Sequence, residues 1–125
     1  MIEPPLLLDG ARVVEYALLD AGPSAGRRSV VAEGVPFALD AVSRLVIAED
    51  LATGGVFLLH CNPDWETLVA GRYADTDSAR ESAQSVYAGI EVRWTPYREL
   101  TPAEAAEVET TRAFLKEITA EFSDE

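Results

Sequence analysis

Three apolar segments joined by two short connections fill the middle of the chain. They are SRLVIAE (residues 43–49), VFLLHC (56–61) and WETLVAGRY (65–73). Gly54 and Gly55 can take positive φ at little cost in the first connection, and Pro63 fixes φ in the second, so both are suited to turns. The pattern predicts an antiparallel meander. The segment 56–61 lacks alternation, which is typical of a central strand covered on both faces.

The first forty residues also contain segments typical of strands. They are PLLLD (5–9), RVVEYALLD (12–20) and VVAEGVPFALD (30–40), and a Gly- and Pro-containing loop, 21–29, separates the last two. In the second segment, alternation places Val14, Tyr16 and Leu18 on one face and the odd-numbered residues on the other. We predict that Val14, Tyr16 and Leu18 form the apolar face of a half-buried strand.

Residues 75–90, DTDSARESAQSVYAGI, predict a first helix. Asp75, Thr76 or Ser78 can serve as its N-cap, and acids occupy its first turn. Ala79, Ala83 and Val86 fall on one stripe, and Gly89 followed by Ile90 is typical of a helix end. A further strand, EVRWTPY (91–97), is predicted to end at Pro96.

Residues 101–122 predict a second helix. Thr101 as N-cap, Pro102 at the first helical position and Glu104 at the third form a typical helix start. The apolar residues Val108, Leu115, Ile118 and Phe122 lie along one side, with Phe114 at its margin. We expect that side to dock on the rest of the protein.

These elements predict an α+β fold. We expect a single domain over residues 1–125, with an antiparallel sheet of about five to six strands and two helices, the last one C-terminal and amphipathic. The chain of 125 residues and 13.5 kDa is long enough for one hydrophobic core and too short for two.

The charge of the chain excludes several classes of partner. With 22 acids against 10 bases, the formal net charge is −12. Binding of nucleic acid or of an anionic membrane needs a cationic surface, so we expect neither. The start of the chain lacks the pattern of a signal peptide, and no apolar run is long enough to span a membrane, which together predict a cytoplasmic protein.

His60 and Cys61 are the single His and the single Cys of the chain, and they are adjacent. In an extended strand, successive side chains point to opposite faces, so the two cannot form a nucleophile and base pair. One Cys cannot form an internal disulfide, and this pair cannot supply a structural zinc site. We therefore expect no catalytic residues, no metal and no cofactor.

Acidic residues are the candidates for partner binding. One group, near two predicted turns, consists of Glu49, Asp50, Asp64, Asp75 and Asp77, and a second, on the last helix, consists of Glu107, Glu117 and Glu121. Residues 99–125 contain eight acids and two bases, which is half of the net charge. A solvated surface explains this charge without a partner, and recognition of a cationic protein is the functional alternative.

The run from Phe57 to Trp94 resembles small bacterial proteins of unassigned function. The resemblance rests on an apolar strand leading into HCNPDW, a second strand, a helix with DSARESAQ, and a closing GIEVRW. The resemblance implies a fold made of a meander and a helix, and it does not imply any particular activity. In size and charge, the chain is also similar to the immunity proteins that neutralise bacterial toxins.

Three functions follow as hypotheses. The first is a non-enzymatic binding domain, of immunity or inhibitor type, that engages a basic protein through its acidic surface. The second is an accessory domain that associates with itself, as a homodimer, through an edge strand or the last helix. The third is a small enzyme with an unidentified site.

Overall fold

The computed structural model describes residues 3–19, 29–38 and 41–123, with side chains as far as residue 118. In chain order the elements are β1 (Leu7–Leu8), β2 (Ala11–Leu18), β3 (Ser29–Ala32), β4 (Val35–Ala38), β5 (Arg44–Asp50), β6 (Val56–Cys61), β7 (Thr67–Tyr73), α1 (Thr76–Val86), β8 (Thr95–Pro96) and α2 (Pro102–Ser123). The predicted α+β class, with two helices of which the last is C-terminal, is confirmed.

Six strands form one antiparallel sheet in the order β1-β2-β5-β6-β7, with β8 also paired to β2. Since β5 occupies one edge of β2, the short strands β1 and β8 share the other. The predicted meander is β5-β6-β7, and β6 is its central strand. Of the segment predicted as a strand over 91–97, Thr95 and Pro96 pair with β2, and the Tyr97 N–H donates to the Val14 carbonyl of β2 at 2.9 Å.

The burial of β2 differs from the prediction. Its buried side chains are the odd-numbered ones, Ala11, Val13, Glu15 and Ala17. The predicted apolar face, Val14, Tyr16 and Leu18, is only partly buried, and Leu18 is 46% exposed.

A β-bulge explains this difference. Val13 pairs with Ala48 and Glu15 pairs with Ile47, so β2 contains one extra residue at Val14. Neighbouring residues of β5 point to opposite faces, and the odd-numbered residues of β2 therefore change face at the bulge. An alternation rule applied to one strand cannot detect such a change.

The segment 30–40, predicted as one strand, contains a hairpin instead. Strands β3 and β4 pair only with each other among the described strands and form a second, two-stranded sheet. Glu33 and Gly34 connect them with φ values of 51° and 81°, the left-handed values that a tight hairpin turn requires.

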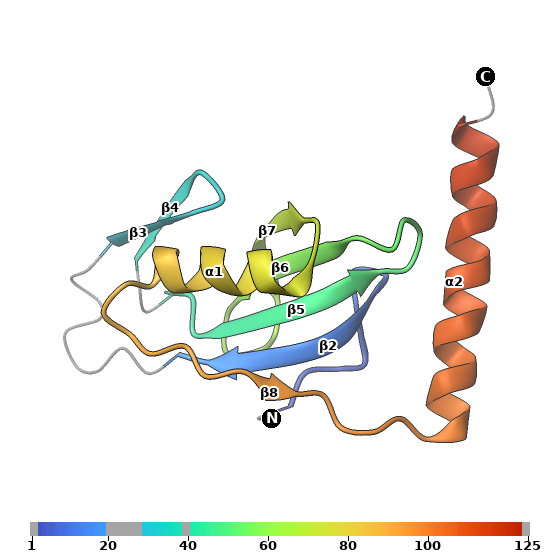
Figure 1. The fold of residues 1–125 in the computed structure, drawn as a ribbon, viewed down its shortest axis with the longest axis horizontal. Coiled ribbons are helices and arrows are strands. Elements are labelled where there is room, and N and C mark those ends of the chain that lie inside the picture. The colour runs from blue at the N-terminus through green and yellow to red at the C-terminus, as the bar shows by residue number, and fades with distance from the viewer. Residues whose placement is uncertain (1–2, 20–28, 39–40, 124–125) are drawn as a thin grey trace.

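The two faces of the large sheet bury different clusters. On one face, α1 contributes Ala79 and Ala83, followed by Tyr87, to a cluster with Leu45 and Leu58. The other face buries a second cluster, the Trp65 cluster, which consists of Trp65, Ala11, Val13, Val46, Ala48, Leu59 and Cys61. Figure 1 shows α1 lying across the sheet and α2 standing at one end of it.

A third, small cluster joins α2 to this end of the sheet. It consists of Leu6, Leu51 and Val108.

Candidate protein-binding surface

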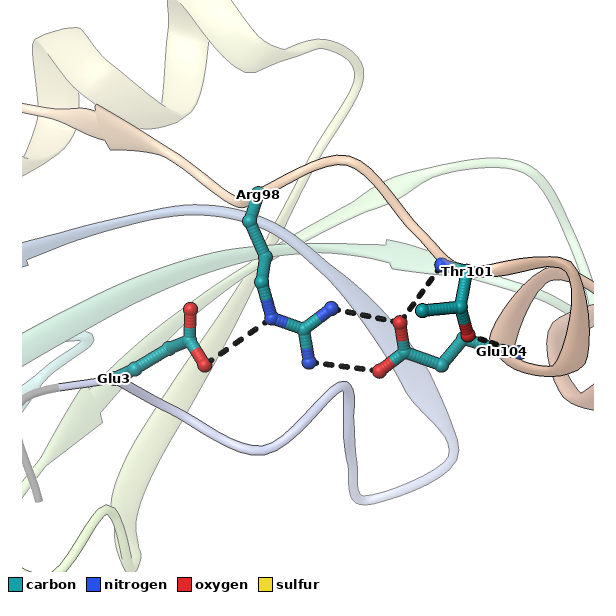
Figure 2. Close-up of polar contacts among 4 residues, drawn as sticks. All are labelled: Glu3, Arg98, Thr101 and Glu104. Atoms are coloured by element: carbon teal, nitrogen blue, oxygen red, sulfur yellow. Dashed lines mark hydrogen bonds and ion pairs between the residues drawn. The ribbon is translucent and has the colours of Figure 1, made fainter.

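The start of α2 is fixed by a reciprocal set of hydrogen bonds (Figure 2). The Glu104 N–H donates to Thr101 Oγ1 at 3.2 Å, and the Thr101 N–H donates to Glu104 Oε1 at 2.9 Å. This is the capping box that the sequence predicts, and it satisfies N–H groups that have no partner inside the helix.

An arginine ties this cap to the body of the protein. Both terminal nitrogens of Arg98 donate to the Glu104 carboxylate at 2.7 Å, and Arg98 Nε lies 3.4 Å from Glu3 (Figure 2). The hydrogen bonds from Arg98, followed by that from the Thr101 N–H, hold the pKa of Glu104 down at about 2. Charged groups at its first turn therefore contribute to holding α2 at this end of the sheet.

Farther along α2, contact with the sheet is sparse. Val108 is the single buried side chain among those the structure describes on this helix. Leu115 lies close to Gly10, and Arg112 bonds Glu49 at 3.2 Å. Leu115 and Ile118 of the predicted docking side are partly buried, and the side chain of Phe122 lies outside the described part.

Phe114 is the most exposed large apolar side chain among those described on α2, with 59% of its surface accessible. At 100° per residue, the positions of Glu107, Phe114, Glu117 and Glu121 fall within an arc of about 80° of the helix. We call these four positions the Phe114 face. Glu107 and Glu117 are exposed, and neither forms an ion pair with any residue whose side chain is described.

Four of the other predicted acids have partners inside the protein. Asp50 accepts from Thr53 Oγ1 at 2.7 Å and lies 3.3 Å from Arg72, whereas Glu49 pairs with Arg112. Asp75 is the N-cap of α1 and accepts from the Ser78 N–H at 2.8 Å, which lowers its pKa.

The last of these four, Asp77, lies 3.4 Å from Arg80. Asp64 is exposed in the turn between β6 and β7. No group of three or more His, Cys, Asp or Glu residues suited to hold a metal occurs within the described ranges. The structure therefore distributes the predicted acids over separate contacts, whereas Glu107 and Glu117 are exposed on the same side of α2 as the Phe114 ring.

His60 and Cys61 point to opposite faces of β6, which confirms the geometric argument against a dyad. His60 faces α1 and bonds Tyr87, whereas Cys61 belongs to the Trp65 cluster. Burial raises the pKa of Cys61 to about 11, so the thiol is protonated at neutral pH and is a poor nucleophile.

His60 belongs to a buried polar network that the sequence does not predict. Its Nε2 lies 3.1 Å from Glu33 Oε2, and its Nδ1 lies 2.7 Å from the Tyr87 hydroxyl. A carboxylate accepts hydrogen bonds, so Nε2–H donates to Glu33, and Nδ1 consequently accepts from Tyr87. Burial lowers the pKa of His60 although Glu33 opposes the effect, so this contact is a hydrogen bond of neutral imidazole at pH 7.

Glu33 also accepts from a second donor, the Tyr73 hydroxyl. The Tyr73 hydroxyl donates to both carboxylate oxygens, at 2.9 and 3.0 Å, and accepts from Ser82 Oγ at 2.6 Å. A Cβ atom on Gly71 would collide with this carboxylate. The network therefore converges on Glu33, which fastens the β3-β4 hairpin to β6 and β7 over a glycine.

Little in the sequence points to this network. His60 is noticeable as the only histidine, but Glu33, Tyr73 and Ser82 are ordinary residues that lie far from it in the chain. The dipeptide Glu33-Gly34 indicates a turn and carries no information about the group that its side chain reaches.

The described helices include none that is both long and apolar enough to cross a membrane. Comparison of the chain with protein-family models, with curated proteins and with solved structures gave no match. The function is therefore inferred from the residues and contacts described above.

Proposed function

We propose that this protein is a non-enzymatic binding domain, of immunity or inhibitor type, that presents the Phe114 face of α2 to a cationic partner protein. The observation that carries the proposal is the exposure of α2. It is a 22-residue helix with a well-formed cap, yet few of its described side chains are buried against the sheet. Tertiary packing usually supplies most of the stability of a helix, and a partner would provide the missing contact.

Phe114 provides the apolar anchor of this face. Large exposed aromatic side chains at the centre of an interface often contribute much of the binding energy, whereas the surrounding polar groups exclude water. Because Glu107 and Glu117 flank Phe114 on the same side of the helix, the surface combines a ring with negative charge. A basic segment with an apolar pocket or stripe is complementary to it.

The charge of the whole chain supports the same class of partner. The protein has a net charge of −12, and α2 contains five acids and two bases. The electrostatic field of this negative charge attracts a cationic protein over distances of about 10 Å at 0.1 M salt. We therefore expect association to slow steeply as salt is added, whereas dissociation depends mainly on Phe114.

The test is a comparative pull-down from the lysate of the source organism at low salt, with quantification of each retained protein. The Phe114→Ser variant should lose a retained basic protein, with about tenfold weaker binding or more. The Glu107→Gln/Glu117→Gln variant should bind it more slowly. Val31→Ser is the matched control, since Val31 is an exposed apolar side chain of β3, far from α2 in the sequence.

The proposal would be refuted if the wild type and the Phe114→Ser variant retained the same proteins in the same amounts. Binding of the purified partner is then measured at two salt concentrations. A salt-independent association rate would argue against recognition by charge.

Self-association is a second candidate function, favoured by the position of β7. This strand lies at the end of the sheet order and pairs with β6 alone among the described strands. A second copy could extend the sheet along it. Sedimentation equilibrium that gives the monomer mass at micromolar concentration would remove this candidate, and Leu68→Ser should weaken a dimer that forms through β7.

A further inference from the structure

A groove of about 410 Å³ lies at the base of α2, away from the Phe114 face. Its lining includes Arg12 of β2, Tyr97, Arg98 and Leu100 of the segment before α2, and Val108 and Glu109 of the helix. This volume is within the range of roughly 300–1,000 Å³ that is typical of small-molecule sites.

Arg12 is the unusual residue of this groove. It lies opposite Glu49 in the register of β2 and β5, but the Glu49 carboxylate pairs with Arg112 of α2. Within the described part of the chain, Arg12 forms no ion pair, and its buried Nε has no hydrogen-bond partner. Acids outnumber bases by more than two to one in this chain, so an arginine without a carboxylate partner requires an explanation.

The other cation of the groove is already neutralised. Arg98 forms its two short bonds with Glu104 and stacks on the Tyr97 ring at 5.1 Å. Arg12 is therefore the group available to an anion. A guanidinium binds a planar carboxylate with two parallel hydrogen bonds, which suits an organic acid better than a spherical ion.

The remaining lining limits the ligand further. Leu100 and Val108 provide apolar surface for a carbon skeleton, whereas the two acids of the lining, Glu99 and Glu109, add negative charge that disfavours a multiply charged anion. We propose that this groove binds a small organic monocarboxylate, whose carboxylate pairs with Arg12 and whose apolar part contacts Leu100 and Val108. This site is independent of the protein-binding function proposed for α2.

The first experiment is an NMR titration of the ¹⁵N-labelled wild-type protein with benzoate. The Arg12 Nε–H resonance reports on the guanidinium directly, and it should shift together with the amides of Tyr97, Leu100 and Val108. Benzyl alcohol keeps the ring without the charge, and inorganic phosphate keeps negative charge without the ring. Both should bind about tenfold more weakly than benzoate or worse, since each lacks one of the two contacts.

Two substitutions and one control variant then test the assignment. Arg12→Gln should weaken benzoate binding by about tenfold or more, because it removes a charged hydrogen-bond pair. Arg93→Gln is the matched control, since Arg93 is an exposed arginine paired with Glu91 outside the groove, and it should leave the affinity unchanged. Glu109→Gln should strengthen binding by removing a negative charge from the lining.

The proposal is overturned if benzoate does not shift the Arg12 resonance, or if phosphate binds as tightly as benzoate. Unchanged affinity in a folded Arg12→Gln protein overturns it as well. If Arg12→Gln does not fold, the wild-type titration with benzoate and benzyl alcohol decides the question alone. Phe114→Ser should bind benzoate normally, so failure of one proposal is distinguishable from failure of the other.

Discussion

The short helix α1 packs closely on the sheet, whereas the helix α2, twice as long, has little contact with it. α1 has 11 residues, and it buries Ala79 and Ala83 completely, with Tyr87 directly after it. α2 has 22 residues, and Val108 is its one buried side chain among those described. Small alanines allow close approach of α1 to β6 and β7, whereas α2 is held mainly near its start.

Polar contacts strengthen the same difference. Arg80 of α1 donates to both oxygens of the buried Glu15, at 2.6 and 2.7 Å, and Tyr87 donates to His60. Among the described side chains, the polar contacts of α2 outside the helix itself are the capping box and ion pairs with Arg98 and Glu49. The short helix is thus part of the core, and the long helix leaves surface available for a partner.

Substitution of one aromatic residue near each helix tests this comparison most directly. Tyr87→Ala removes a fully buried ring and should lower the free energy of unfolding by about 3–5 kcal/mol. Phe114→Ala removes an exposed ring, and the expected change is within about 0.5 kcal/mol. Urea denaturation of both variants provides the measurement, and similar losses in the two would contradict the comparison.

Gly71→Ala tests how the β3-β4 hairpin is fastened beside α1. The new Cβ collides with the Glu33 carboxylate, so we expect a loss of about 1–3 kcal/mol in the free energy of unfolding. Glu33→Gly removes the carboxylate and suits the positive φ of that position. In a double-mutant cycle, Gly71→Ala should cost less in the Glu33→Gly background, and an equal cost would show that the collision is not the cause.

The Thr101→Ala substitution concerns the anchored end of α2. Loss of the N-cap hydroxyl should cost about 1 kcal/mol. Hydrogen exchange should become faster at Glu104 and its neighbours, while α1 stays protected. Thr101→Ser keeps the hydroxyl and serves as the control, and equal exchange rates in both variants would argue against the capping role.

Because His60 is buried beside α1, we expect the stability of the folded protein to depend on pH. Burial lowers the pKa of His60 in the folded state, so the unfolded chain binds a proton more readily. Its contribution is therefore fully favourable above the ordinary pKa of about 6.5, and stability decreases as the pH falls from there toward the lower folded value. The urea concentration at the midpoint of unfolding should therefore decrease as the pH is lowered through this range. In the His60→Gln variant the midpoint should depend less on pH.

Sequence patterns predicted the elements whose determinants lie within a few residues. The capping box of Thr101 and Glu104, the N-cap Asp75 among its alternatives, and the turns of the β5-β6-β7 meander are confirmed. The opposite orientations of His60 and Cys61 also follow from strand geometry alone. These features depend on local hydrogen bonds and on periodicity, which a linear sequence records directly.

Tertiary structure decided everything that depends on contacts between distant segments. The bulge at Val14 changed the buried face of β2, and the hairpin of 29–38 brought Glu33 to His60. The pairing of Glu49 with Arg112, which leaves Arg12 without an ion pair in the described part of the chain, was likewise set by the packing of α2 beside β2 and β5. Sequence by itself determined the local elements and the net charge, whereas only the fold determined which charges are neutralised, because pairing depends on distances between segments.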